Sequence, residues 1–378
     1  MKNPFEYGGV VSGGAFCNRQ KELADLLRAM ENAEKLFVFS ERRYGKTSLV
    51  RAALAKLPRK GYVHAYVDLW PTDSEATFIT AVAKAMAESM SGSVAKLLET
   101  AKQFFGSLSP SVTMDKEGKP VLTFGVAKHA PLGAALEEVL ETPARIAARG
   151  GPRVVVVFDE FQQILEYGND QMERKLRSVI QHHDQVGYLF LGSRKHLIQK
   201  MVLDRQRPLF GSGGRYPLGP IAEEHWQPFI RRRFADADKR VEDQHIHHIC
   251  EMTQGHPFYT QHLCHVLWEL CEPESVVNEK MLQSAVKLLL DRESYAYTTL
   301  WESLALSQKR FLKGLALEAV GVKVFAGEFV NRHGLGSASN AQRAVQALLA
   351  KDIIDRDNGS FLITDRFFRL WIQSAQAA

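Results

Sequence analysis

The sequence contains few cysteines and no long apolar run, and both absences narrow the class of protein. Only four cysteines occur among 378 residues, and their spacing is irregular, so we expect no disulfide framework and a reducing compartment. The longest dense apolar run, Val154–Phe158, is far shorter than the roughly 18 residues that a membrane-spanning helix needs. The amino terminus lacks the charged-then-apolar pattern of a signal peptide. We therefore expect a cytoplasmic protein without a membrane span.

Neither sign of charge is in large excess. The formal net charge is +5, which permits contact with nucleic acid without requiring it. Basic residues outnumber acidic ones between Arg174 and Arg240, and this band either faces phosphate or forms ordinary solvated helix faces. The 45% hydrophobic and 24% charged residues are typical of a globular protein, and the length suggests two or three domains.

A histidine-rich stretch between His245 and His265 also contains Cys250 and Cys264, so a metal site has to be considered. Its spacing matches no zinc pattern. We therefore favour ordinary surface or core histidines over metal ligands.

Apolar runs alternate with helical patterns over residues 1–220, which predicts an α/β core. The expected strands are Leu36–Phe39, Tyr62–Leu69, Arg153–Phe158 and Tyr188–Leu191. Because helices lie between buried strands, the sheet should be parallel. Two alternating runs separated by polar residues predict a β-hairpin inserted near 109–126.

The pattern becomes helical after Pro220, which predicts a helical lid over residues 221–300 and a winged helix over residues 301–378. The lid helices are expected at Ile221–Phe234, His245–Thr253, Phe258–Cys271 and Glu279–Leu290. Three further helices are expected at Ser307–Ala319, Ala326–Arg332 and Asn340–Ala350, followed by a hairpin at Ile353–Ile363. Three helices followed by a hairpin describe a winged helix.

The segment Ser40–Thr47 matches the phosphate-loop pattern except at its first position, where Ser40 replaces glycine. Gly45 allows the backbone to approach phosphate, Lys46 places a positive charge between the β and γ groups, and Thr47 offers a hydroxyl to Mg²⁺. The alternative is a chance Gly-Lys-Thr after a strand. The motif predicts binding of ATP with Mg²⁺.

The second chemical signal is the apolar strand Val154–Phe158, which ends in Asp159 and Glu160. In phosphate-loop enzymes the first such carboxylate reaches the magnesium shell and the second polarises the attacking water. Acidic residues after a strand also cap helices, but Lys46 upstream favours the catalytic interpretation. We expect Asp159 to bind the metal with Thr47, and Glu160 to act as the catalytic base.

The strand Tyr188–Leu191 is followed by Gly192, Ser193 and Arg194, which places a hydroxyl and a guanidinium at the same sheet edge. Ser193 is a candidate sensor of the γ-phosphate, and an ordinary loop is the alternative.

Three arginines follow this strand in a segment rich in turns, namely Arg205, Arg207 and Arg215. A trans arginine can stabilise the charge that develops on the transferred phosphoryl group. Arg207 is the leading candidate because the adjacent Pro208 restrains the backbone. The alternative is a salt-bridged surface arginine.

These residues together resemble the archaeal-type ATPases, a branch of the signal-transduction ATPases related to AAA+ proteins. The resemblance runs from Asn3 to Trp371, with departures at Ser40 and Glu41. It is carried by Asn3–Phe5, Phe16–Leu23, Arg42–Leu49, Asp159–Gln162, Gly192–Ser193, Arg207–Phe210, Gly255–Phe258 and Thr364–Trp371.

The resemblance implies further nucleotide contacts beyond the motif residues. At the phosphate loop these are Arg43, Tyr44 and Ser48, and in the amino-terminal segment the contact is Arg19. On the helical lid they belong to a Gly-x-Pro block and are Gly255, His256 and Pro257. The family further implies an ATP-dependent switch or remodeller that carries a winged helix.

Several functions remain open after this comparison. The first is an ATPase switch that transmits its nucleotide state to a protein partner. The second is an initiator-like ATPase whose winged helix binds duplex DNA through the helix at Ala341–Leu349, with Asn340, Gln342 and Arg343 reaching bases. A third is nucleotide binding without turnover, which the intact Glu160 argues against. The sequence does not identify the partner, and an oligomer is compatible with it.

Overall fold

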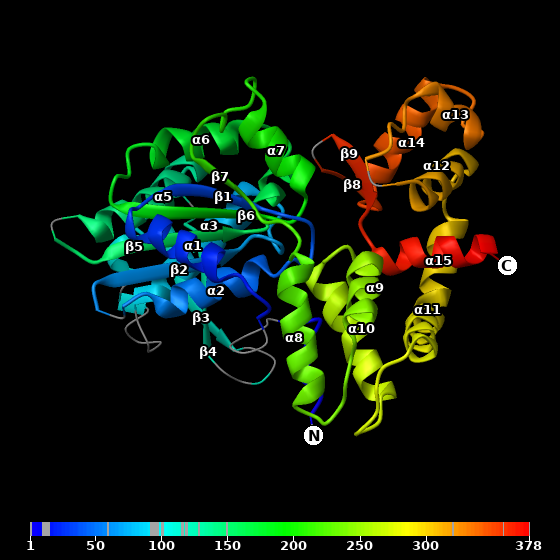
Figure 1. Ribbon diagram of the computed structural model, residues 1–378. Coiled ribbons are helices and arrows are strands. Elements are labelled where there is room, and N and C mark those ends of the chain that lie inside the picture. The colour runs from blue at the N-terminus through cyan, green and yellow to red at the C-terminus, as the bar shows by residue number, and fades with distance from the viewer. Residues whose placement is uncertain are drawn as a thin grey trace.

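The computed structural model describes residues 2–9, 16–58, 60–90, 98–99, 102–114, 117, 120–127, 129–148, 150–319, 321–357 and 359–377. Figure 1 shows a parallel sheet between two layers of helices, followed by a helical region that ends in a winged helix. This arrangement confirms the predicted fold class. Within the described ranges, no helix combines the length and the apolar character needed to cross a membrane.

The α/β core occupies the first part of the chain. In order its elements are α1 (Gln20–Glu31), β1 (Lys35–Phe39), α2 (Lys46–Lys56), β2 (Tyr62–Asp68), α3 (Glu75–Met90), β3 (Leu108–Met114), β4 (Pro120–Val126), α5 (Leu132–Ala147), β5 (Arg153–Asp159), η2 (Phe161–Tyr167), α6 (Gln171–Ile180), β6 (Val186–Gly192), α7 (Lys195–Leu203) and β7 (Gly214–Pro217).

The helical region and the winged helix follow. Their elements are α8 (Glu223–Ala235), α9 (Asp243–Thr253), α10 (Pro257–Leu270), α11 (Glu279–Glu302), α12 (Leu306–Leu317), α13 (Gly327–Arg332), α14 (Ala338–Ala350), β8 (Ile354–Asp357), β9 (Ser360–Ile363) and α15 (Arg366–Ala377).

The five strands of the main sheet are all parallel and lie in the order β2-β5-β6-β1-β7. Successive side chains of a strand point to opposite faces, so the valine run of β5 serves two cores. Val154 and Val156 pack with α3, α5, α6 and α7, whereas Val155 and Val157 pack with α1 and α2. Because β5, β6 and β1 are parallel neighbours in this order, their carboxyl ends lie side by side at one edge of the sheet.

Two features of the core differ from the expectation or add to it. Strand β7 pairs with β1 but is only four residues long and includes Gly214 and Pro217, so its sequence carries a weak strand signal. Strands β3 and β4 form an antiparallel hairpin over the expected positions, and part of its connecting loop lies outside the described residues.

The lid and the winged helix share one apolar core that extends from Phe5 to Ile372. Helix α11 continues without a break to Glu302, so the expected boundary at residue 300 lies inside a helix. The amino-terminal segment packs on the lid, where Phe5 contacts Phe234 of α8 in a tilted arrangement, with 5.6 Å between ring centroids. The Phe5 carbonyl oxygen also lies 2.8 Å from His265 Nδ1 of α10.

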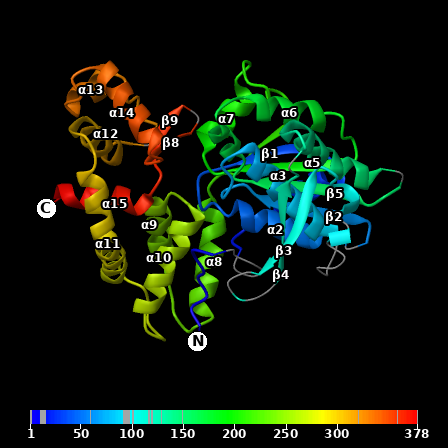
Figure 2. The same ribbon diagram turned by 180° about the vertical axis from the view of Figure 1, so that it is seen from behind.

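The winged helix folds back against the α/β core. Its hairpin, β8 paired with β9, contacts α7, and its last helix, α15, packs on α11 and α12. Figures 1 and 2 show this hairpin pointing from α14 toward α7 in both views. Residues more than 150 positions apart in the sequence therefore meet beside the carboxyl edge of the sheet.

Candidate functional site

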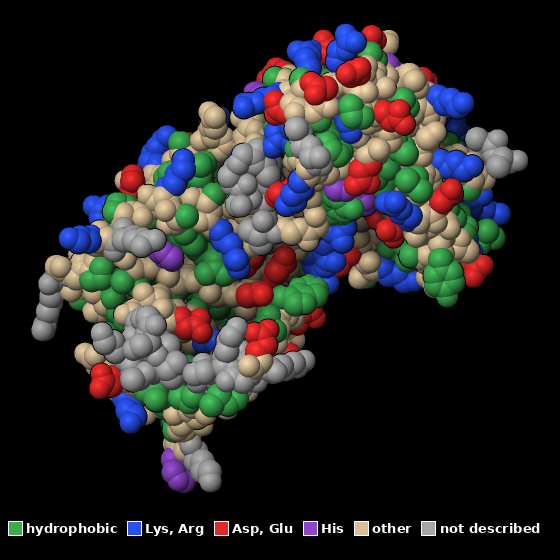
Figure 3. Space-filling view, turned by 90° about the horizontal axis from the view of Figure 1, so that it is seen from below, with side chains coloured by type: hydrophobic (Ala, Val, Ile, Leu, Met, Phe, Trp, Pro, Cys, Tyr) green, Lys and Arg blue, Asp and Glu red, His purple; other side chains and the backbone are tan. Residues whose placement is uncertain are grey.

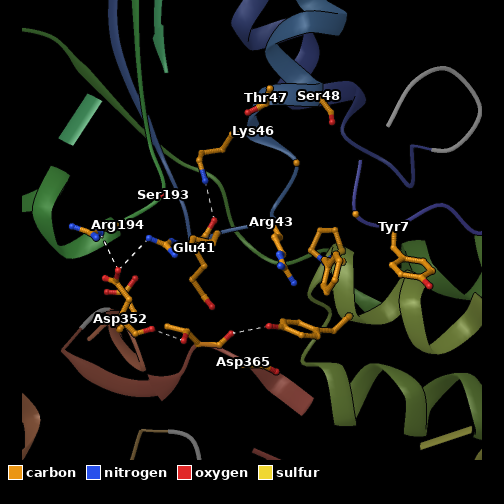
Figure 4. A pocket seen from close by; sticks show the side chains of 18 of the residues that line it. Tyr7, Glu41, Arg43, Lys46, Thr47, Ser48, Ser193, Arg194, Asp352 and Asp365 are labelled. Atoms are coloured by element: carbon orange, nitrogen blue, oxygen red, sulfur yellow. Dashed lines mark hydrogen bonds and ion pairs between the residues drawn. The ribbon is translucent and has the colours of Figure 1, made fainter. Parts of the chain in front are cut away.

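A cavity of about 680 Å³ opens at the carboxyl edge of the main sheet. Its walls come from the loop before α2, the ends of β5 and β6, lid helix α10, and the winged-helix segments around β8 and before α15. The amino-terminal residues 6–9 and Trp70, which follows β2, also line it. Figure 4 shows the phosphate loop on one side and the winged-helix carboxylates on the other.

The loop from β1 to α2 has the shape that the motif predicts. Gly45 has φ 82° at the amino-terminal end of α2, a left-handed conformation that glycine adopts without steric cost. Arg43 also has a positive φ, of 60°. The amides of the first helical turn lie at the cavity end of α2, where a helix favours negative charge.

Lys46 lies buried at the start of α2. Its Nζ donates to Ser40 Oγ and to the Glu41 carbonyl oxygen, each at 2.9 Å. Burial lowers the pKa of Lys46 to about 8, and the nearby Glu160 and Asp159 carboxylates oppose that shift. The ammonium is therefore held by oxygen acceptors in a position that suits phosphate.

Asp159 ends β5 and is the acceptor for three donors. Thr47 Oγ1 donates to its Oδ2 at 2.8 Å, the Tyr66 hydroxyl donates to the same oxygen, and the Glu160 amide donates to Oδ1 at 2.9 Å. Burial and the adjacent carboxylate raise the pKa of Tyr66 strongly, so its hydroxyl stays protonated and remains a donor. A carboxylate beside a threonine hydroxyl is an oxygen donor set that fits Mg²⁺.

Glu160 occupies a left-handed conformation, with φ 54°, directly after β5. Ser193, at the end of β6, donates its hydroxyl to Glu160 Oε2 at 2.6 Å, and the Gln162 amide donates to the same oxygen. The pairing of β5 with β6 brings these groups together. Glu160 and Ser193 both line the cavity.

The Gly255–Pro257 block of the lid contacts the phosphate loop through His256. His256 is buried, accepts from the Phe258 amide at Nδ1 (3.2 Å) and lies 3.1 Å from the Arg42 carbonyl oxygen at Nε2. Burial holds the pKa of His256 well below its usual value, so the neutral ring donates from Nε2 to that carbonyl. Pro257 lines the cavity, and His256 acts on the loop backbone.

Three other expected contacts also lie at this loop. Tyr44 is buried and donates to Glu41 Oε1 at 3.0 Å. The Arg43 guanidinium lies 4.4 Å from the Phe258 ring centroid, and Arg43 and Ser48 line the cavity. The aromatic ring thus orients Arg43 at the rim.

Arg19 and Gly255, two of the expected site residues, lie outside the cavity lining. Arg19 donates to the Gly219 carbonyl oxygen at 2.7 Å and pairs with Glu22. The Gly255 carbonyl accepts from the Ile221 amide at 3.0 Å, which joins the lid to the segment after β7. These two residues therefore hold the segment that connects β7 to the lid, Arg19 from the side of α1 and Gly255 from the lid.

The basic band between Arg174 and Arg240 contributes one arginine to the cavity lining, Arg194. The Arg207 guanidinium is bound to the buried Glu173 carboxylate of α6, whose pKa is raised to about 7 by burial. Arg205 and Arg215 are exposed. In this conformation of a single chain, Arg207 forms an internal ion pair and does not face the phosphate loop.

Polar contacts from the winged helix reach the phosphate loop and were not expected from the sequence. Arg366 donates to Glu41 Oε1 at 3.1 Å, and both side chains are buried. Asp352 pairs with Arg42 and with Arg194. These contacts join residues about 150 to 325 positions apart, a proximity that only the folded chain shows.

The histidine-rich stretch forms ordinary contacts. His247 lies 2.9 Å from Glu223, and His245 is buried in α9. The part of the chain that the structure describes holds no group of three or more His, Cys, Asp or Glu side chains arranged to bind a metal ion.

Two models of known families match the chain. The model described as an ATPase domain predominantly from Archaea matches residues 16–263. A second model, described as a probable winged helix domain, matches residues 295–374. Comparison with curated proteins finds no match.

Solved structures share the fold along nearly the whole chain. A Walker-type ATPase of Pyrococcus abyssi has a TM-score of 0.65 and 15% sequence identity, over 98% of this chain and 99% of that one. The ORC2 protein of Aeropyrum pernix, in its ADPNP-ADP complexes, has a TM-score of 0.54 and 14% identity, over 100% and 99%. At these identities the likeness establishes the fold alone.

Proposed function

Because the chain belongs to the family of ATPase domains found predominantly in Archaea, we propose that this P-loop ATPase couples Mg²⁺-dependent ATP hydrolysis to movement of its winged helix. One observation carries the proposal. Lys46, the Thr47–Asp159 pair and Glu160 converge at the same edge of the sheet, which is where a phosphate-loop enzyme needs its charge, metal ligands and base.

Each residue has a separate role in the proposed reaction. Lys46 and the first amides of α2 bind the phosphates, and Thr47 with Asp159 would hold Mg²⁺, which supplies neutralising charge when bound. Glu160 accepts the proton of the attacking water. Ser193 and Gln162 position the Glu160 carboxylate through their hydrogen bonds, so Ser193 acts through Glu160 in the described conformation.

The proposed output of the site is a change in the position of the winged helix. The lid and the winged helix share one core, and winged-helix residues line the same cavity as the phosphate loop. A change in the bound nucleotide therefore acts on groups that belong to both moving parts. In the proposal that we favour, the partner that responds to the position of the winged helix is a protein.

The test of nucleotide binding is Lys46→Ala, with Lys56→Ala as the matched control on the same helix. Lys56 is exposed near the end of α2, so its loss should leave ATP affinity unchanged. We expect Lys46→Ala to abolish measurable ATP binding in calorimetry, because the buried ammonium is the phosphate ligand. Unchanged affinity in Lys46→Ala would refute the proposed site.

Duplex DNA is a second candidate partner, and the exposed face of α14 favours it. Gln342, Arg343 and Gln346 are exposed there, whereas the Asn340 amide donates to the Leu335 carbonyl oxygen at 3.2 Å. On the face in Figure 3, described basic and acidic side chains are interspersed, so that face offers no continuous basic surface. DNA binding that weakens with salt and in Arg343→Ala would support this candidate. Equal binding by Arg343→Ala would exclude α14 as the reading helix.

A further inference from the structure

Asp352 lies between two guanidinium groups at the rim of the cavity. Its Oδ2 is 3.1 Å from Arg42 Nη2 and 3.0 Å from Arg194 Nε. All three residues line the cavity, and Figure 4 shows Asp352 reaching Arg194 from the winged-helix side. Arg42 belongs to the phosphate loop, Arg194 follows β6, and Asp352 stands between α14 and β8.

The backbone at Asp352 is also unusual. Its φ is 54°, a left-handed conformation that a non-glycine residue adopts at some cost unless its surroundings hold it. The two ion pairs supply such surroundings. Nearby, Asp355 Oδ1 lies 2.9 Å from His196 Nδ1 of α7, so the start of the β8–β9 hairpin is attached to the core by adjacent polar contacts.

The two guanidiniums line the same cavity as Lys46 and Glu160, the residues that the proposed reaction places beside the hydrolysed phosphate. That phosphate must come within reach of Glu160, and the Ser193 hydroxyl that contacts Glu160 immediately precedes Arg194. Arg42 lies in the loop that leads to Lys46. Guanidinium groups bind phosphate by paired, charge-assisted hydrogen bonds, so a terminal phosphate and the Asp352 carboxylate require the same donors.

We propose that Arg42 and Arg194 bind the terminal phosphate of ATP, and that Asp352 occupies these two groups until the phosphate displaces it. This inference rests on the proposed function. Displacement detaches the β8–β9 hairpin from α7 and releases the winged helix. ADP lacks the terminal phosphate and leaves the contact in place, so Asp352 makes release specific for the triphosphate.

Thermodynamic linkage makes the proposal quantitative. If ATP favours the released state, a change that releases the winged helix and leaves the phosphate ligands intact must raise ATP affinity. Asp352→Asn removes the competing charge while keeping the size of the side chain. Its affinity for a non-hydrolysable ATP analogue should rise by about fivefold or more, within the range of about 5–150-fold that is common for such coupling. Its affinity for ADP should change by less than this factor.

The experiment measures binding and release separately in the full chain. Calorimetry gives the affinities for the ATP analogue and for ADP in wild type, Asp352→Asn, Arg194→Gln and Glu328→Gln. Glu328 is the matched control, because it pairs with Arg332 on α13 of the same winged helix and does not line the cavity. Hydrogen exchange of the amides in α7 and β8 reports release, and thermal unfolding verifies that each variant is folded.

The expected pattern has three parts. The ATP analogue, but not ADP, increases exchange in α7 and β8 of the wild type. Asp352→Asn shows increased exchange before nucleotide is added, and it binds the analogue more tightly. Arg194→Gln also shows increased exchange before nucleotide, but its preference for the analogue over ADP falls.

Two results would overturn the proposal. One is an unchanged ratio of analogue to ADP affinity in Asp352→Asn, even if exchange increases, because the carboxylate would then hold the domains without competing with phosphate. The other is equal exchange in the presence of the analogue and of ADP. A wild type that binds neither nucleotide would instead refute the proposed function itself, so the two failures are distinguishable.

Discussion

Ser40 stands where phosphate loops usually carry glycine, and its local geometry explains why a side chain fits there. The positive φ values of this loop occur at Arg43 and Gly45, so position 40 does not require glycine. The Ser40 hydroxyl accepts from Lys46 Nζ and donates to the Glu41 carbonyl oxygen, both at 2.9 Å. The serine therefore helps to hold the lysine that the motif depends on.

Arg207 illustrates how a single residue can fit two roles. Its sequence position suggested action on a phosphate, but its guanidinium is bound to Glu173, whose side chain is only 2% exposed. Removing one partner of a buried ion pair leaves an uncompensated charge, at a cost of about 3–5 kcal/mol. Arg207 itself is partly exposed, so the cost should lie at or below the lower end of this range.

We therefore expect Arg207→Ala to lower the thermal unfolding midpoint while leaving ATP affinity unchanged. Calorimetric unfolding and ATP binding measure the two effects separately. Arg205→Ala is the matched control, since Arg205 is exposed in the same segment. If Arg207→Ala kept wild-type stability but hydrolysed ATP more slowly, with rescue on mixing with Glu160→Gln protein, the arginine would act between subunits.

At the scale of elements, the strands at the catalytic edge were predictable and the contacts between distant elements were not. The apolar run of β5 predicts a buried strand because few other structures accommodate four consecutive valines followed by phenylalanine. The carboxyl edge followed from the parallel order, and it brought Lys46, Asp159 and Glu160 into one site.

Other contacts depend on features that local patterns do not contain. Tyr66 reaches Asp159 because β2 pairs with β5 in register, with Tyr66 opposite Val157. The Arg366–Glu41 and Asp352–Arg194 pairs depend on how the winged helix folds back. Charged residues in a sequence do not indicate their partners, since most such residues are solvated. Helix α15 was not among the helices expected from the sequence, although Thr364–Trp371 was one of the segments that carried the family resemblance.

The contact between the lid and the segment after β7 depends on one glycine, Gly255. Gly255 has φ 64°, and a Cβ at this position would lie 2.4 Å from the Ile221 carbonyl oxygen. An alanine would therefore combine an unfavourable backbone conformation with a clash against the main chain.

We expect Gly255→Ala to destabilise the protein by about 1–3 kcal/mol, the cost of a strained residue of this kind. Denaturant unfolding measures the loss. Gly133→Ala is the control, because a Cβ there meets open space and alanine is preferred to glycine within a helix. Equal stability of Gly255→Ala and wild type would show that the lid can shift away from Ile221 at no cost.

At the scale of the whole molecule, one cavity is built from the α/β core, the lid and the winged helix. The lid and the winged helix share an apolar core, whereas the winged helix meets the phosphate loop through ion pairs. Apolar cores hold elements together strongly. A partly exposed ion pair such as Arg42–Asp352 contributes little and can exchange partners, whereas the Arg366–Glu41 pair is buried and costly to break. The movement that we propose for the winged helix would therefore break the Asp352 contacts more readily than the Arg366–Glu41 contact.

The measurement that tests the central claim most directly is ATP turnover by Glu160→Gln, together with its ATP affinity. The substitution keeps the shape of the side chain and removes its basicity. We expect ATP affinity within a few-fold of wild type and turnover at least about a hundredfold slower, since general-base assistance contributes about 10²–10⁴. The control is Glu137→Gln, an exposed glutamate of α5 that pairs with Lys175, which should hydrolyse ATP at the wild-type rate. Wild-type turnover by Glu160→Gln would contradict the account.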